Sequence, residues 1–141
     1  NEVSLLRAGP QAAKLPIWVD NRQRMDERVC DGVLVATPAG STAYNYSAHG
    51  PILPMGADVL AMTALNAYRP RRWRGALLPK TAVVRIDVLD NTKRPVMADA
   101  DSISFKNVKK VEISSETKIQ HRILFNEGHG LDERLIQEQF V

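Results

Sequence analysis

The sequence predicts a mainly β fold: an α+β, sandwich-like domain with a few short helices. From Thr81 onward, short runs of alternating apolar residues recur at regular spacing between turn residues, which is typical of two packed antiparallel sheets. Near the middle of the chain, Gly32 to Thr37 is almost unbrokenly apolar and rich in valine, which indicates a strand buried on both faces. A helical period appears at the end, where Leu131, Leu135, Ile136 and Phe140 fall on one face.

The length and composition fit a single domain covering residues 1–141. A chain of 141 residues can bury about two-thirds of the surface that its unfolded form exposes, and 44% apolar with 25% charged residues is ordinary for a globular protein. Since the chain begins with Asn1 rather than Met, we expect it to continue a longer protein. The single cysteine, Cys30, and the lack of a signal peptide or membrane-spanning run predict a cytoplasmic protein without a membrane partner. The net charge of +3 suits an anionic small molecule.

The first residues predict a strand from Asn1 to Leu6, followed by a loop at Gly9-Pro10. Asn1 and Glu2 offer an amide that can pair with a base edge and a carboxylate that can accept from ribose hydroxyls. The alternative for this pair is an ordinary solvated strand end.

A β-hairpin is predicted next, with arms at Lys14 to Asp20 and Arg24 to Cys30 and a turn at Asp20-Asn21-Arg22. Because proline cannot donate a ladder hydrogen bond, Pro16 predicts an edge position for the first arm.

The turn after the buried strand is the predicted functional site. Pro38 should end the strand, and the small residues from Ala39 to Thr42 let the backbone pass close to something else, which we interpret as a ligand. Ser41 or Thr42 is predicted to cap a short helix through Ser47, leaving amides and two hydroxyls facing outward beside Tyr44, a flat stacking surface. The alternative is a capped helix with Tyr44 in the core.

Two segments follow this turn. Ala57 to Leu65 places apolar residues at helical spacing and predicts a short buried helix or turn. Arg69 to Arg74 reads RPRRWR and interleaves an aromatic ring with four guanidinium groups, which is the one feature that resembles a nucleic-acid patch. Because it is short and no basic stripe matches it elsewhere, a surface loop or subunit contact is the favoured interpretation.

The last part of the chain predicts strands and one helix. Val84 to Val88 alternates, Asp90 to Arg94 is a polar turn, and a strand returns over Pro95 to Asp99. Further strands are expected at Ser102 to Phe105, Val111 to Ser114 and Ile119 to Phe125. The final helix carries Asp132 and Glu133 in its first turn, where the helix dipole favours them, and should pack on the sheet.

The residues that a zinc site, a serine hydrolase or a P-loop would require do not occur in the necessary pattern. The histidines at 49, 121 and 129 have no metal-ligand spacing, so zinc is not expected. Gly40-Ser41-Thr42-Ala43 lacks the second glycine of a G-x-S-x-G elbow, which makes a serine hydrolase a weak alternative. The chain also contains no P-loop.

The central stretch resembles the nucleotide-binding signature of NAD kinases. Asp31-Gly32 is followed by TPAGSTAY at residues 37–44 and SAHGP at 47–51, against the usual DG, TPTGSTAY and SAGGP. Ala39 replaces a threonine and His49 a glycine, and neither change removes the hydroxyls, the amides or the ring. Asn1-Glu2, the RGALLP segment at 74–79 and the GHGLDERLIQEQF ending also resemble the family, so the likeness covers nearly the whole chain.

The resemblance implies the β-rich C-terminal domain of an NAD kinase, which phosphorylates the adenosine ribose 2′-hydroxyl of NAD with ATP or polyphosphate, with magnesium as the metal ion. Asn1 and Glu2 would hold the adenosine, while Asp31 and Ala64 would lie near the nicotinamide end, often across a subunit interface of a homodimer or homotetramer. The implied pocket wall consists of Thr42, Ala43, Tyr44 and Ser47.

The same resemblance limits what this chain can do alone. The family's general base belongs to a Gly-Gly-Asp-Gly loop in a preceding domain, and no such loop occurs in these residues, so the isolated chain should be inactive. Many bacterial members have arginine two residues before the aspartate, where this chain has Val29. A non-catalytic oligomerisation module and a nucleic-acid module remain the alternative functions.

Overall fold

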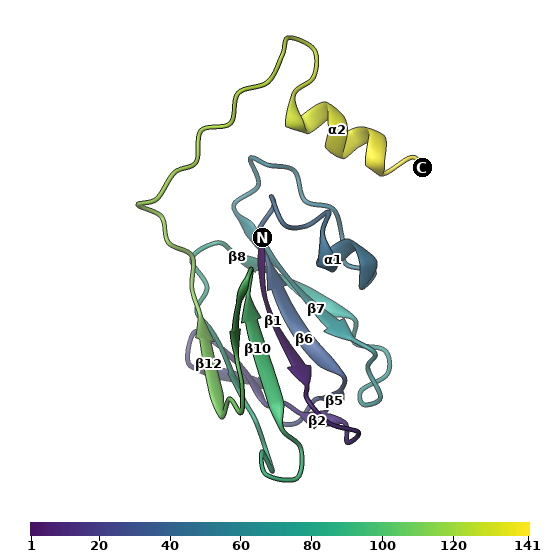
Figure 1. The fold of residues 1–141 in the computed structure, drawn as a ribbon, viewed down its shortest axis with the longest axis vertical. Helices are drawn as coiled ribbons and strands as arrows, with labels where there is room; N and C mark the ends of the chain where they lie inside the picture. Colours follow the sequence, from purple (N-terminus) through teal and green to yellow (C-terminus); the bar gives the residue numbers. More distant parts are fainter.

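The computed structural model describes residues 1–141 as two packed antiparallel sheets with a small third one (Figure 1). The larger sheet has the order β11 (Ile103–Phe105), β10 (Val96–Ala100), β1 (Glu2–Arg7), β6 (Gly32–Ala36), β7 (Val59–Leu65) and β8 (Gly75–Pro79). The smaller sheet has the order β12 (Lys110–Ile113), β9 (Val84–Asp87), β3 (Ile17–Val19) and β4 (Arg22–Met25). A two-residue ladder joins β2 (Ala13–Lys14) to β5 (Val29–Cys30), and the two helices are α1 (Tyr44–Ser47) and α2 (Leu131–Glu138).

The core lies between the two larger sheets, so the sandwich prediction is confirmed. Leu5, Val33 and Val35 from the six-stranded sheet belong to one buried cluster with Ile17 and Ile86 from the four-stranded sheet. This burial of aliphatic side chains from both sheets is the main force that holds the layers together.

Strand β6 is buried along its whole length, as its valine-rich sequence predicts. Val33 and Val35 point into the sandwich core, whereas Leu34 and Ala36 pack on the other face with Leu65 and with Ala48, which follows α1. The segment carrying α1 therefore covers the outer face of β6, and this packing fixes the predicted functional turn against the sheet.

Two predictions of secondary structure are wrong. Residues 57–65 contain no helix, because Val59 to Leu65 forms β7 between β6 and β8, where both edges of its backbone are paired; a short apolar run does not distinguish a buried helix from a central strand. Ile119 to Phe125 is not a strand. It ends in three consecutive apolar residues, Ile123 to Phe125, but has no neighbouring strand, and Leu124 is 88% exposed.

A hairpin forms around the predicted turn, but its arms are shorter than predicted, because Val29–Cys30 pairs with β2 in a separate sheet. The edge position is wrong. Strands β3 and β4 pair around Asp20 and Asn21, which both have positive φ, as a tight two-residue turn requires. Strand β3 lies between β9 and β4 rather than at an edge. Pro16 precedes the first residue of β3, so the strand loses no ladder hydrogen bond to it.

A crossover follows β9. The polar turn at Asp90 to Arg94 is confirmed by a 2.7 Å hydrogen bond from the Arg94 N–H to the Asp90 carbonyl. The returning strand β10 does not pair with β9, however, but joins β1 in the other sheet.

Helix α2 forms where the sequence predicts it, with Asp132 and Glu133 in the first turn. It does not pack on a sheet. Its one buried side chain, Leu135, lines a small cavity with Ile52 and Pro54, while Ile136 remains half exposed. Figure 1 shows α2 beyond the end of the sheets, reached by the long segment that leaves β12. Neither helix is long and apolar enough to cross a membrane.

Candidate functional site

The turn after β6 folds against the first residue of the chain. The Thr37 N–H and hydroxyl both donate to the Asn1 carbonyl, at 3.0 and 3.1 Å, and the Gly40 N–H donates to the Thr37 hydroxyl oxygen at 3.1 Å. A Cβ at Gly40 would overlap the Asn1 carbonyl. The prediction that the small residues make room for a ligand is therefore wrong at Gly40, because the close neighbour is the chain's own backbone.

Ser41 faces inward rather than outward. Its hydroxyl donates to the Pro38 carbonyl at 2.7 Å and accepts from the Leu53 N–H at 2.9 Å, and the residue is fully buried. The residue at the N-cap of α1 is Ala43, and no side chain caps the helix. The predicted capping by Ser41 or Thr42 is wrong, since the Ser41 hydroxyl instead ties the turn to the segment at Leu53.

A buried asparagine, which sequence reasoning missed, organises α1. The Asn45 amide nitrogen donates to the Ser41 and Pro51 carbonyls at 3.0 and 2.8 Å, and its oxygen accepts from the Thr63 hydroxyl at 2.6 Å. Asn45 is fully buried, so these bonds link α1 to both the following turn and β7 in a dry environment. The available sequence signal was the four-residue spacing of Ser41 and Asn45, which places two polar residues on one helical face.

Asn1 and Glu2 line the first of two cavities beside this turn. The cavity has a volume of about 570 Å³, and its wall includes Pro38 and Ala39 as well as Lys80 from the end of β8. Burial raises the pKa of Glu2, and its Oε2 atom is buried without a hydrogen-bond partner. This oxygen is therefore available to accept a hydrogen bond from a bound molecule.

Tyr44, Ser47 and Ala64 line the second cavity, which has a volume of about 450 Å³. The Tyr44 side chain is 36% exposed, so the alternative that placed it in the core is wrong. Thr42 and Ala43 line neither cavity and lie, half-buried, in the turn between Ala39 of the first wall and Tyr44 of the second.

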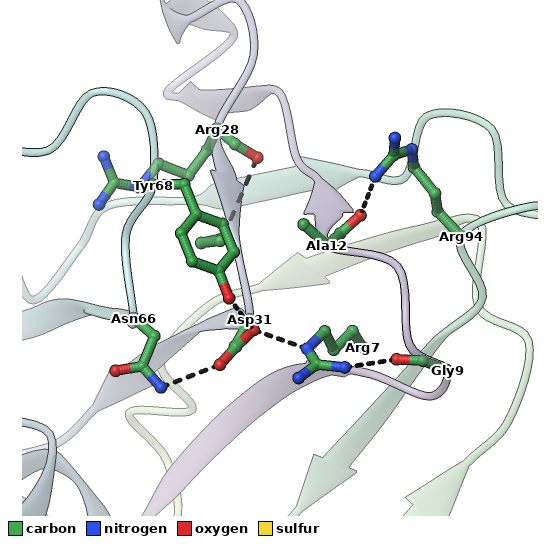
Figure 2. Close-up of polar contacts among 9 residues, drawn as sticks. Arg7, Gly9, Ala12, Arg28, Asp31, Asn66, Tyr68 and Arg94 are labelled. Carbon is green, nitrogen blue, oxygen red and sulfur yellow. Dashed lines mark hydrogen bonds and ion pairs between the residues drawn. The ribbon is translucent and has the colours of Figure 1, made fainter.

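Asp31 lines neither cavity and is held by three side chains (Figure 2). Arg7 Nε and the Tyr68 hydroxyl donate to its Oδ1 at 2.6 and 3.1 Å, and Asn66 Nδ2 donates to its Oδ2 at 2.9 Å. Partial burial alone would raise the pKa of Asp31, but the hydrogen bonds from Asn66, Arg7 and Tyr68 together hold it below its usual value. Asp31 is thus an ionised, oriented acceptor, and Asn66, which itself lines the second cavity, connects it to that space.

Tyr44 feels the charge of two predicted site residues. The pKa of its phenol is raised first by burial and then by the negative charges of Asp31 and Glu2. The predicted residues are thus divided around the turn and α1: Asn1 and Glu2 line the first cavity, and Tyr44, Ser47 and Ala64 line the second. Asp31 lines neither and is joined to the second by the hydrogen bond from Asn66.

Arg28 is a second residue that sequence reasoning missed. It is fully buried, its two terminal nitrogens donate to the Pro70 and Trp73 carbonyls at 2.6 Å each, and its guanidinium stacks 4.7 Å from the centre of the Trp73 ring. Burial lowers the pKa of Arg28. The nearby Cys30 is not a candidate nucleophile, because burial raises the pKa of its thiol to about 12.

Comparison with known proteins gives a consistent result. The family model for the ATP-NAD kinase C-terminal domain matches residues 1–121. An NAD kinase of Cereibacter sphaeroides is 73% identical over 141 residues, which is 100% of this chain and 56% of that protein. An NAD kinase of Hyphomonas neptunium is 56% identical over 141 residues, or 100% of this chain and 55% of that protein. The chain thus spans about half the length of the curated relatives it matches.

Two solved structures share the fold. Yeast NADH kinase complexed with NADH matches with a TM-score of 0.74 and 29% identity, over 84% of this chain and 34% of that one. An NAD kinase from Archaeoglobus fulgidus in complex with ATP matches with a TM-score of 0.72 and 23% identity, over 83% of this chain and 45% of that one.

Proposed function

The chain belongs to the ATP-NAD kinase family, and from this premise we propose that it forms the NAD-binding part of an enzyme that phosphorylates the adenosine ribose 2′-hydroxyl of NAD with ATP. The observation that carries the proposal is that the turn after β6 has a cavity on either side, the first lined by Asn1, Glu2 and Ala39 and the second by Tyr44 and Ser47. A dinucleotide has two nucleoside ends, and two cavities that share one turn suit such a ligand. Glu2 supplies a carboxylate in the first cavity, and the second is lined by Asn66, which is hydrogen-bonded to Asp31.

Each residue has a role that its surroundings support. Asn1 and Glu2 hold the adenosine portion, since the unpartnered Glu2 oxygen can accept from a ribose hydroxyl. Tyr44 and Ser47 form the wall of the second cavity, with the exposed Tyr44 ring stacking on a base. Thr42 and Ala43, which line neither cavity, belong to the turn that holds this wall in place. Asp31 and Ala64 lie at the nicotinamide end, where the ionised Asp31 accepts from the carboxamide.

Catalysis by this part of the enzyme is positioning rather than proton transfer. Phosphoryl transfer depends on alignment of the attacking oxygen with the donor and on neutralisation of charge. Asp31 is a poor general base, because three donors already occupy its carboxylate and its pKa is lowered. The family resemblance implies instead a general base in a Gly-Gly-Asp-Gly loop, which does not occur in these 141 residues.

Other properties of the whole enzyme stay part of the proposal. We expect magnesium to enter with the ATP phosphates, and these residues contain no group of three His, Cys, Asp or Glu side chains that could hold a metal ion. We also expect a cytoplasmic homodimer or homotetramer, with ATP or polyphosphate as the phosphoryl donor.

The proposal is tested by measuring NADP formation from NAD and ATP with an NADP-specific dehydrogenase as the coupling enzyme. The full-length protein should form NADP, whereas the 141-residue chain alone should give the background rate. If the full-length protein forms no NADP and gives no heat on titration with NAD, the non-catalytic module is the better description. If the chain alone phosphorylates NAD, the assignment of the base is wrong and Asp31 becomes the leading candidate.

A further inference from the structure

The arginine-rich loop from Arg69 to Arg74 is not a continuous basic patch. Of its four arginines, Arg71 and Arg74 line the second cavity together with Tyr44 and Ser47, whereas Arg69 and Arg72 do not. All four arginines are exposed, but only Arg71 and Arg74 border the predicted NAD-binding wall. This division also argues against the nucleic-acid alternative, which needs the charges on one face.

Two fixed points hold this loop in place. Buried Arg28 bonds to the Pro70 and Trp73 carbonyls, on either side of Arg71, and stacks on the Trp73 ring. The Arg74 carbonyl accepts from the Ala64 N–H at 2.8 Å, which anchors the end of the loop to β7. Arg71 and Arg74 are therefore presented to the cavity by a loop whose backbone is tied down.

The charge at this cavity is unbalanced. Its wall contains no carboxylate. Neither the Arg71 nor the Arg74 side chain makes an ion pair or hydrogen bond within the chain. Asp31, which is hydrogen-bonded to the lining residue Asn66, already pairs with Arg7. Two arginines that line one cavity and have no ion-pair partner in the chain are suited to a phosphate group, to which arginine donates two parallel hydrogen bonds.

We propose that Arg71 and Arg74 bind the phosphate groups that link the two nucleosides of the dinucleotide, and that Arg28 positions them. This inference rests on the proposed function, since it takes NAD as the occupant of the second cavity. It adds a phosphate subsite to a wall whose roles assigned above are stacking by Tyr44 and hydrogen bonding by Ser47. Arg28 acts through the loop backbone and is a positioning residue.

The kinetic test uses the full-length protein with Arg71→Gln and Arg74→Gln, and Arg72→Gln as the matched control on the same loop. Loss of one charge-assisted contact should raise the KM for NAD by about tenfold or more in each of the first two variants. The KM for ATP should stay within about twofold, and Arg72→Gln should leave both values unchanged. Equal effects of Arg71→Gln and Arg72→Gln on the KM for NAD would overturn the proposal.

A binding test separates this inference from the proposed function. Calorimetry with ADP-ribose, which carries the linked phosphates, and with adenosine, which does not, should show weaker ADP-ribose binding in the two cavity variants and unchanged adenosine binding. Failure of the wild-type protein to form NADP would refute the proposed kinase, while these titrations would still decide the role of the arginines. Equal losses for both ligands, or a change of oligomer mass in the variants, would identify the loop as a subunit contact instead.

Arg28→Lys tests the positioning role, because lysine keeps the charge but cannot bridge both carbonyls in a planar fork. The ratio of ADP-ribose to adenosine affinity should fall severalfold, a readout that a general loss of stability does not move. An unchanged ratio would remove Arg28 from the proposal.

Discussion

Replacing Asn45 by aspartate tests whether the buried amide network holds the functional turn. The substitution keeps the shape of the side chain and the oxygen that accepts from Thr63. It replaces the amide nitrogen with an oxygen that faces the Ser41 and Pro51 carbonyls, at the 3.0 and 2.8 Å positions where the two hydrogen bonds now lie. A favourable contact with each carbonyl becomes a repulsive one.

The expected loss of stability is large. Each buried carbonyl left without its donor costs about 1 to 3 kcal/mol, so the two together cost about 2 to 6 kcal/mol, a substantial part of the 5 to 15 kcal/mol typical of a domain. The introduced carboxyl is buried beside oxygen atoms, so its folded-state pKa should lie above its unfolded value of about 3.9. Stability is then greatest below the unfolded pKa and is lost as the pH rises through the folded pKa.

The assay is urea unfolding of the full-length protein at pH 7 and pH 4.5, followed by tryptophan fluorescence. Asn45→Asp should lose more stability at pH 7 than at pH 4.5, because the protonated carboxyl can donate to one of the two carbonyls. Asn107→Asp, at an exposed turn with positive φ, makes the same chemical change without burial and should stay within about 0.5 kcal/mol of wild type at pH 7. Equal effects of the two substitutions, or a greater loss for Asn45→Asp at the lower pH, would refute the reasoning.

Three further changes probe the neighbouring residues. Tyr44→Ala should weaken NAD binding, measured by calorimetry, by about 1 to 3 kcal/mol and Tyr44→Phe by much less; equal losses would mean that the ring is not a stacking surface. Asp31→Asn should raise the KM for NAD more than that for ATP in steady-state kinetics, and an unaltered KM with a large fall in melting temperature would make Asp31 structural. Because the pKa of Asp31 is lowered in the folded state, its ionised form stabilises the protein above the unfolded pKa, and this stabilisation is lost as the pH falls through the folded pKa. The free energy of unfolding of Asp31→Asn should therefore fall less steeply than that of wild type as the pH is lowered. Gly40→Ala should destabilise by about 1 to 3 kcal/mol in thermal unfolding, because its Cβ would overlap the Asn1 carbonyl, and an unchanged melting temperature would contradict that contact.

Short sequence patterns predicted correctly the strands and turns whose conformation depends on their own residues. The valine-rich run at Gly32 to Ala36 was identified as a doubly buried strand because burial on both faces leaves no polar position in the sequence. The tight turn at Asp20 and Asn21 was found because these residue types tolerate positive φ. Neither inference needs to know which strand lies next to which.

The wrong predictions concern segments whose structure depends on whether another strand, distant in the sequence, lies beside them. Val59 to Leu65 became a strand because β6 and β8 lie on either side of it, and Ile119 to Phe125 did not become one because no strand lies beside it. Pairing between distant segments is a tertiary effect that a window of sequence does not contain. The same holds at the site, where the neighbour of Gly40 is Asn1, thirty-nine residues earlier in the chain.

The residues of the functional turn therefore divide into two classes with different consequences. Gly40, Ser41 and Asn45 face inward and hold the turn against Asn1, Leu53 and Thr63, and a Cβ at Gly50 would overlap the Asn45 amide oxygen. Tyr44 and Ser47 face the second cavity. Because the inward residues set the position of the outward ones, substitutions in the first class should reduce stability and NAD affinity together, whereas those in the second should reduce affinity alone. The free energy of unfolding and the NAD affinity should be measured on the same set of variants. If every residue of the turn contacted the ligand, substitutions in both classes would reduce NAD affinity without a consistent loss of stability.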